Sequence, residues 1–197
     1  MIVLDITRRQ PAFDMDEMET RQFQADLAKR GLELGEHVRL ARTIQASGAD
    51  VWKVISKPGQ LTKYHPYCRE NDVYKWPGVG SRDGVTFHSG LYAERDFMCW
   101  REGLGYDLQI GPPPRKVAWS SWNIRPIEEA QSELSIMDTP ILESHLLETT
   151  KKSYVQTYFG KSIEVYLDSL LRGVEQFVMT GQAVKPRQFG THPVYAP

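Results

Sequence analysis

The chain has 197 residues, 41% of them apolar and 11% aromatic, so it can bury a sizeable core and is not a disordered protein. Its 24 Lys and Arg residues nearly balance its 25 Asp and Glu residues, which argues against a nucleic-acid-binding protein because such domains usually carry a basic excess. Two cysteines, no secretory segment and no long apolar run lead us to expect a cytoplasmic protein without membrane insertion or a disulfide framework.

Residues 1–35 are expected to form an N-terminal arm and a surface helix. Residues 1–12 resemble a short strand or an extended arm that ends at Pro11. Asp14 with Glu17 predicts a helix start, and Gly31 predicts its stop. The apolar stripe between these positions is thin, which indicates a helix lying on the surface of the main domain.

From Glu36 onward the apolar residues recur at every second position. Val38, Leu40, Ile44 and Ala46 would share one face of a half-buried strand. Ser47-Gly48 breaks this pattern, and two short helices are expected over 50–57 and 60–64. The second helix should stop before Pro66, since a residue that precedes proline avoids helical angles.

Six further strand candidates follow, and Gly and Pro residues separate most of them. Their short connections predict antiparallel pairing of strands that are neighbours in sequence. The candidates are approximately 69–75, 84–89, 92–101, 106–110, 116–125 and 132–137.

A long helix over 153–180 should close the domain, before a tail of residues 182–197. Ser153 with Gln156 fits a capping box, and Gly181 fits a C-terminal cap. This helix would be roughly 40 Å long, enough to cross a small domain. Apolar residues at three- and four-residue steps give it a wide apolar stripe, and we expect a sheet to cover that stripe: Val155, Phe159, Ile163, Tyr166, Leu167, Leu170, Val174, Phe177 and Val178.

Strands and helices that are kept apart along the chain indicate an α+β fold. This order resembles the START-like helix-grip superfamily (SRPBCC), which includes polyketide cyclases/dehydrases and lipid-transport domains. The resemblance lies in the strand-to-helix entry at 46–52, in His65-Pro66 after the second short helix, and in the glycine turn at 76–84. It covers residues 36–181. It implies a curved antiparallel sheet of about six to seven strands wrapped around the long C-terminal helix, with two short helices after the first strand and a ligand cavity between sheet and helix.

Arg42 is the first candidate for a polar anchor in that cavity. It is in phase with Leu40 and Ile44, so its guanidinium should face the core, where it must meet an anionic or carbonyl group. A structural pair with an internal carboxylate is the alternative, as is a side chain that reaches water at the strand edge. Arg95, in phase with Phe97, raises a similar choice between cross-strand pairing on the outer surface of the sheet and a pocket role.

His65, Tyr67 and Cys68 cluster after the second short helix, where the resemblance places one mouth of the cavity. His65 and Cys68 could supply two zinc ligands, but a catalytic zinc needs three protein ligands, so no metal is expected. A hydrogen-bonding pair of His65 and Tyr67, or an ordinary loop histidine, remain as alternatives. Trp119 and Trp122 are three residues apart on one strand, so they should face opposite sides of the sheet.

The sequence contains no nucleophile elbow, no P-loop and no complete dinucleotide fingerprint, so no cofactor is expected. The leading hypothesis is binding, or transport, of a small hydrophobic lipid-like, isoprenoid or polyketide-like molecule with at least one oxygen. One alternative is a cofactor-independent cyclase, aromatase or dehydratase, with His65 as general base and Arg42 or a Tyr stabilising an enolate. The other is a protein-interaction module. A homodimer is compatible with each of them. The expected ligand-binding residues are Arg42, His65, Tyr67, Trp100, Trp119, Phe159, Ile163 and Tyr166.

Overall fold

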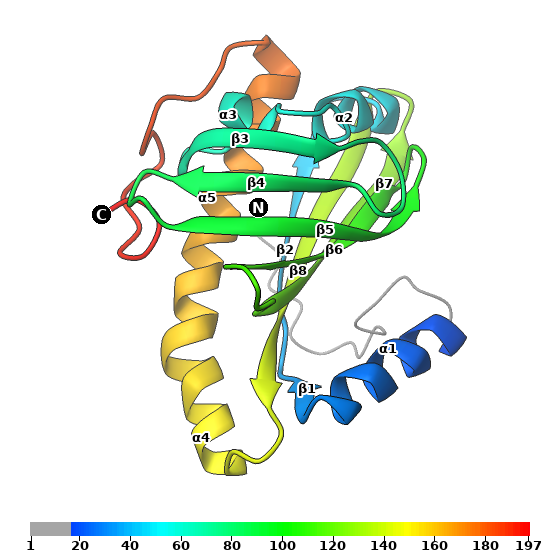
Figure 1. Cartoon of the computed structure of the whole chain (residues 1–197). Helices are drawn as coiled ribbons and strands as arrows, with labels where there is room; N and C mark the ends of the chain where they lie inside the picture. The colour runs from blue at the N-terminus through cyan, green and yellow to red at the C-terminus, as the bar shows by residue number, and fades with distance from the viewer. Residues whose placement is uncertain (1–16) are drawn as a thin grey trace.

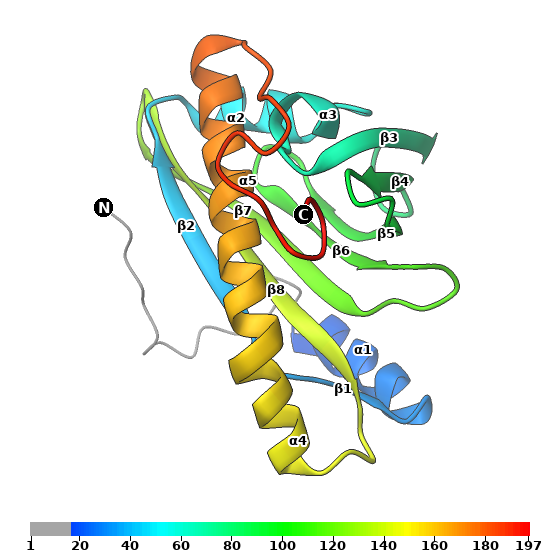
Figure 2. The same cartoon turned by 90° about the vertical axis from the view of Figure 1, so that its left-hand side faces the viewer.

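The computed structural model describes residues 17–197, so the arm expected over residues 1–12 lies outside the described residues. Within them, one antiparallel sheet of eight strands curls around a long helix, as Figures 1 and 2 show. This is the helix-grip fold that the sequence resemblance implies. The strands are β1 (Leu32–Leu34), β2 (Val38–Ile44), β3 (Cys68–Lys75), β4 (Arg82–Phe87), β5 (Tyr92–Arg101), β6 (Gly105–Gly111), β7 (Ala118–Glu128) and β8 (Gln131–Glu143).

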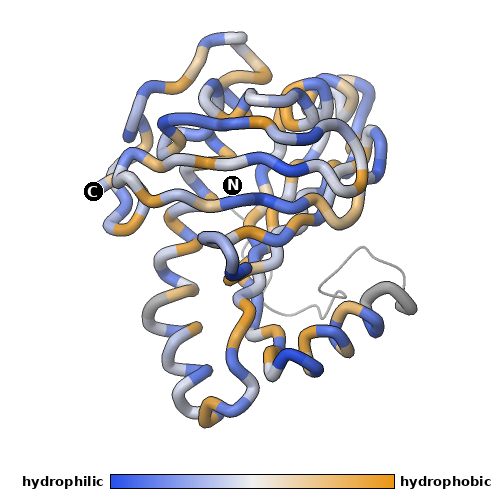
Figure 3. The backbone as a smooth tube through the Cα atoms, in the orientation of Figure 1, coloured by the Kyte–Doolittle hydropathy of each residue, from blue (hydrophilic) through white to orange (hydrophobic). Residues whose placement is uncertain are grey.

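The strand order is β1-β8-β7-β6-β5-β4-β3, and β2 also pairs with β8. The register places Val38 opposite Asp138 and Leu34 opposite Ile141, so β2 and β1 follow one another along the same edge of β8. At the other end of the sheet, the edge strand β3 is mostly hydrophilic (Figure 3). Charged residues on an edge strand oppose pairing with other chains.

The helices are α1 (Glu17–Lys29), α2 (Gly48–Ile55), α3 (Leu61–Tyr64), α4 (Glu148–Ser153), the π-helical turn η1 (Tyr154–Phe159) and α5 (Gly160–Thr180). The side chain of Ser47 caps α2 by accepting from the N–H of Asp50. Gly181 ends α5 in the left-handed conformation with φ 68°, as its sequence position predicts. None of the helices in residues 17–197 is long and apolar enough to cross a membrane.

The capping box predicted at Ser153 is wrong, because Ser153 has helical backbone angles and its side chain makes no capping hydrogen bond. The helix begins earlier, with α4. There the ammonium group of Lys151 meets Glu33 of β1 at 2.6 Å, Glu148 at 2.9 Å and the carbonyl of Ser144 at 3.1 Å. These contacts tie α4 to the end of the sheet, a tertiary constraint that the local sequence pattern does not contain.

The core lies between the concave face of the sheet and α5. Most of the apolar stripe predicted for the long helix is buried there, including Phe159, Ile163, Leu167 and Leu170. Gly173 lets α5 approach α3 closely, since a Cβ at this position would lie 1.9 Å from the carbonyl oxygen of Tyr64. This contact fixes the helix against the segment that carries His65 and Tyr67.

Candidate functional site

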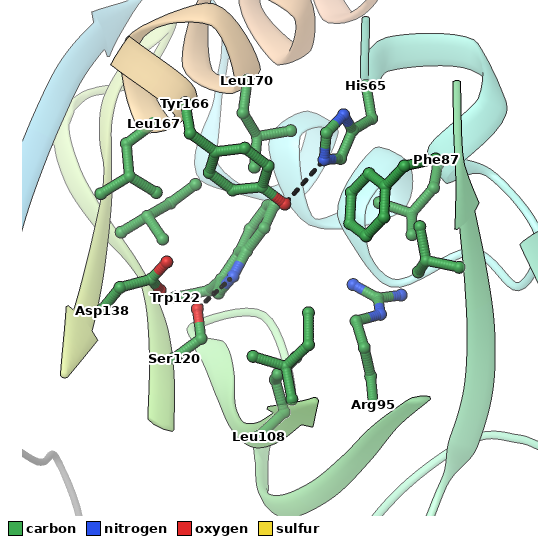
Figure 4. A pocket seen from close by; sticks show the side chains of 14 residues that line it. His65, Phe87, Arg95, Leu108, Ser120, Trp122, Asp138, Tyr166, Leu167 and Leu170 are labelled. Carbon is green, nitrogen blue, oxygen red and sulfur yellow. Dashed lines mark hydrogen bonds between the residues drawn. The ribbon is translucent and has the colours of Figure 1, made fainter. Parts of the chain in front are cut away.

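A cavity with two adjoining lobes lies between the sheet and α5. The inner lobe has a volume of about 30 Å³ and the outer lobe about 130 Å³. Phe87, Ile110, Asp138 and Tyr166 line both lobes, so these four residues mark the passage between them. The walls are mainly apolar, and the few polar side chains gather around the inner lobe (Figure 4). Ligand sites commonly combine an apolar lining with a few convergent polar groups.

His65 and Tyr166 form a buried hydrogen-bonded pair at the wall of the inner lobe. The distance from His65 Nε2 to the Tyr166 hydroxyl is 2.8 Å, and the N–H of Tyr67 donates to His65 Nδ1 at 3.2 Å. Because Nδ1 accepts, the single proton of the neutral ring lies on Nε2, which donates to Tyr166. Burial lowers the pKa of His65 to about 3, and the nearby Arg95 adds to this effect. The imidazole is therefore neutral at physiological pH.

Asp138 of β8 is the carboxylate of the cavity. Its residue is only 6% exposed, and its Oδ1 atom has no hydrogen-bond partner among residues 17–197. Burial raises the pKa of Asp138 to about 6, while a hydrogen bond from the Ser120 side chain opposes part of that rise. Figure 4 shows the carboxylate directed into the cavity. A buried acceptor without a partner is rare in folded proteins and indicates a place for a further group.

Arg95 of β5 contributes the cationic group of the inner lobe. Its Nε atom donates to Asp83 Oδ1 at 2.8 Å, and both residues are almost fully buried. Burial opposes the charge of the guanidinium, but the Asp83 carboxylate outweighs this effect and holds the pKa of Arg95 above its usual value. The sequence left open whether Arg95 pairs across strands or faces the pocket. It faces the cavity and is buried there with Asp83, which lies opposite it on β4, so the alternative of pairing on the outer surface of the sheet is wrong.

The C-terminal tail covers part of the outer lobe. The ring centroid of Tyr195 lies 4.6 Å from that of Phe87 and 4.8 Å from that of Tyr166. The N–H of Ser89 donates to the Tyr195 carbonyl at 3.0 Å. His192 closes a turn over 192–196 through paired backbone hydrogen bonds with Ala196. Its Nε2 atom lies 3.0 Å from the carbonyl oxygen of Ser162, which anchors this turn to α5. The tail therefore supplies a wall of the cavity, a role that its sequence did not indicate.

The π-helical turn brings an extra aromatic side chain to the outer lobe. The N–H of Gly160 bonds to the carbonyl of Val155 five residues earlier, and a Cβ on Gly160 would lie 2.7 Å from that oxygen. Tyr154 and Phe159 both line the lobe, with ring centroids 6.1 Å apart. In a regular α-helix, residues five apart point in directions that differ by roughly 140°. The wider turn thus places both rings at the cavity.

Of the eight residues expected to bind ligand, four line the cavity: His65, Phe159, Ile163 and Tyr166. Tyr67 lies beside them, and its hydroxyl donates to Ser169 at 2.8 Å, but it is not part of the lining. Trp100 belongs to an aromatic cluster outside the cavity, where it stacks on Tyr106 with ring centroids 5.7 Å apart.

Trp119 and Arg42 lie away from the cavity. Trp119 faces the convex side of the sheet, where its ring packs 4.4 Å from Phe23 of α1, while Trp122 lines the inner lobe. The two tryptophans therefore face opposite sides as expected, but the inward one is Trp122. Arg42 is partly exposed and pairs with Glu175 of α5, which is also partly exposed, so its role is a structural ion pair, although the carboxylate is not the internal one considered for it. The ion pair with Glu175 holds the Arg42 guanidinium near the surface, where water can also reach it.

Sequence reasoning missed Asp138, Ser120 and Tyr195. A signal for Asp138 was present, because it continues the two-residue phase of Leu134 and Ile136, but the predicted strand stopped at Met137. In the structure β8 runs through Pro140, whose carbonyl accepts from the N–H of Gly35 at 2.9 Å.

A metal site is not evident in residues 17–197, where no three His, Cys, Asp or Glu side chains are grouped as metal ligands. The Cys68 thiol donates to the carbonyl oxygen of Glu70, with Sγ 3.3 Å from that oxygen, and burial raises the pKa of the thiol to about 12. A protonated thiol is a poor metal ligand, because metal ions bind the thiolate.

Known structures share this fold. No family model and no curated protein matches the sequence. Norcoclaurine synthase from Thalictrum flavum, solved with dopamine and hydroxybenzaldehyde, is 13% identical, with a TM-score of 0.59 over 79% of this chain and 92% of that chain. Ara h 8.0201 is 15% identical, with a TM-score of 0.55 over 76% and 99%. An uncharacterized protein from Bacillus thuringiensis is 14% identical, with a TM-score of 0.54 over 73% and 99%. At these identities the likeness shows the fold alone.

Proposed function

We propose that the protein binds a small, mostly apolar molecule with at least one oxygen in the cavity between the sheet and α5. The observation that carries the proposal is a lined cavity in which a buried carboxylate, Asp138, has an oxygen without a protein partner among residues 17–197. Such an oxygen costs free energy in the empty protein, and a ligand group can satisfy it. Lipid-like, isoprenoid and polyketide-like compounds with a polar group fit this description.

The ligand can be identified by native mass spectrometry of the purified protein, followed by denaturing extraction. A bound apolar compound would support the proposal and give its chemical class. Phe159→Trp should fill the outer lobe and reduce the bound fraction, whereas Arg42→Ala removes a partly exposed ion pair and should leave the bound fraction unchanged. Equal retention of ligand by the Phe159→Trp variant and the wild type would contradict this location.

A cofactor-independent cyclase or dehydratase is the second candidate, and the state of Asp138 favours it. A carboxyl group with a pKa of about 6 and a free oxygen can exchange protons near neutral pH. His65 is less suited to act as base, because both of its ring nitrogens are engaged within the protein. If the bound compound is turned over, Asp138→Asn should abolish turnover and retain binding of a product analogue.

A protein-interaction module remains the third hypothesis. Deletion of residues 1–35 should then remove partner capture, while Phe159→Trp should have no effect on it. Loss of capture in the Phe159→Trp variant would instead link any partner to the cavity.

A further inference from the structure

Asp138 presents an acceptor to the cavity. The indole N–H of Trp122 donates to the Ser120 hydroxyl oxygen at 3.2 Å, which leaves the single Ser120 proton to be donated onward. The Ser120 side chain favours the charged form of the Asp138 carboxyl group and so opposes part of the rise in its pKa that burial causes. Asp138 stands opposite Ser120 in the strand register. Asp138 Oδ1 has no hydrogen-bond partner among residues 17–197, and Figure 4 shows the carboxylate directed into the cavity, where it can accept a hydrogen bond.

Tyr166 presents a donor to the same space. Its oxygen accepts from His65 Nε2, so its own O–H proton must be directed elsewhere. Burial raises the pKa of Tyr166 well above its ordinary value, so the phenol keeps that proton at neutral pH. Tyr166 and Asp138 line both lobes of the cavity. The lining that the two lobes share thus includes one residue with an acceptor and one residue with a donor.

A neutral hydroxyl group matches this pair, since it donates one hydrogen bond and accepts another. A cationic amine fits less well. It would have to give up its hydration in a lobe that already contains the Arg95 guanidinium, whose charge lowers the pKa of His65. A carboxylate would meet the like charge of Asp138. The inner lobe, at about 30 Å³, has room for a hydroxyl group.

The volume and apolar lining of the outer lobe limit the size and polarity of the ligand's body. Its volume of about 130 Å³ is similar to that of apolar cavities that take up a single benzene ring. Its lining includes Phe87, Ile110, Phe159 and Ile163. We propose that the ligand of this cavity is a small alcohol or phenol, whose neutral hydroxyl donates to Asp138 and accepts from Tyr166 while its apolar body fills the outer lobe. This inference rests on the proposed function and specifies its ligand class.

The test uses 4-ethylphenol and its methyl ether 4-ethylanisole, which differ in one hydrogen-bond donor. Dissociation constants are measured with the full chain at pH 7.5 by two-dimensional NMR titration. The phenol should bind at least about tenfold more tightly than the ether, since a buried acceptor left unpaired weakens binding of the ether. The cationic 4-methylbenzylamine should bind more weakly than the phenol.

Variants assign the effect to Asp138. Asp138→Asn should reduce the preference for the phenol over the ether to less than about threefold, because the amide replaces one of the two carboxylate acceptor oxygens by an NH₂ donor and removes the negative charge. Glu143→Gln makes the same carboxylate-to-amide change at a partly exposed site on β8, and should leave the preference unchanged.

The outcomes separate the two proposals. Equal binding of phenol and ether by the wild type, or an unchanged preference in Asp138→Asn, would overturn the hydroxyl inference and leave the binding function standing. A preference for 4-methylbenzylamine would also overturn it. Failure of all three probes to shift the resonances of cavity residues at their solubility limits would overturn both.

Discussion

Replacing Asp138 by Asn removes one ionisable group and changes the volume of the side chain very little. The residue is 6% exposed, and burial raises its pKa from 3.8 to about 6. The folded protein therefore holds a proton on this group between roughly pH 4 and pH 6, where the unfolded chain has released it. Such a group stabilises the fold most below pH 3.8, and this contribution is lost as the pH rises through 6.

The size of the effect follows from the shift. A rise of about two units in the pKa of Asp138 changes its contribution to the free energy of unfolding by about 3 kcal/mol between low and high pH. Asp138→Asn has no such titration. The free energy of unfolding of the variant, minus that of the wild type, should therefore increase by about 2–3 kcal/mol between pH 4 and pH 7.5.

The assay is urea denaturation of both proteins at several pH values, followed by fluorescence of the tryptophans. The difference between the two proteins isolates Asp138, because the other groups near it are present in both. His65 has a lowered pKa, so its contribution is lost as the pH falls, the opposite direction. Tyr166 and Arg95 have raised pKa values and do not titrate in this range. A difference that stays constant from pH 4 to pH 7.5 would refute the reasoning.

Leu170 is 2% exposed in the middle of the apolar stripe, so Leu170→Ala should lower the free energy of unfolding by about 2–5 kcal/mol in the same assay; a loss below about 1 kcal/mol would contradict its burial. Tyr166→Phe leaves the Nε2 proton of His65 without its acceptor and should cost about 1–3 kcal/mol. Tyr166→Phe should also weaken binding of 4-ethylphenol, while the control Tyr67→Phe, which breaks only the bond to Ser169, should not. An affinity of the Tyr166→Phe variant equal to that of the wild type would argue against Tyr166 as a donor. Tyr195→Ala should open the outer lobe and speed dissociation of 4-ethylphenol at least about threefold in NMR exchange measurements, and an unchanged rate would show that the tail does not control access.

The long helix and the sheet could be predicted because their signals are local. The apolar stripe of the helix has the helical period, and the first strand shows a clear period of two. The same local signals place Phe159, Ile163 and Tyr166 on the face that lines the cavity.

The polar part of the site depends on contacts that periodicity does not contain. Arg42 has the phase of an inward residue, yet Glu175 pairs with it near the surface. Trp119 and Trp122 are equivalent in sequence terms, and only the position of Phe23 on α1 shows which of them is covered from outside. Asp138 could have been found from its phase alone if the predicted strand had been continued one residue beyond Met137.

Two hydrogen bonds at and beside the cavity join distant parts of the chain. The His65–Tyr166 pair spans 101 residues, and the Tyr67–Ser169 pair spans 102. Closing loops of this length has an entropic cost that the chain recovers only when α5 settles on the sheet, so the cavity should assemble late in folding. An unfolded or half-folded chain then has no site for the ligand. By mass action, the ligand would stabilise the native state alone, and the melting temperature would rise with its concentration.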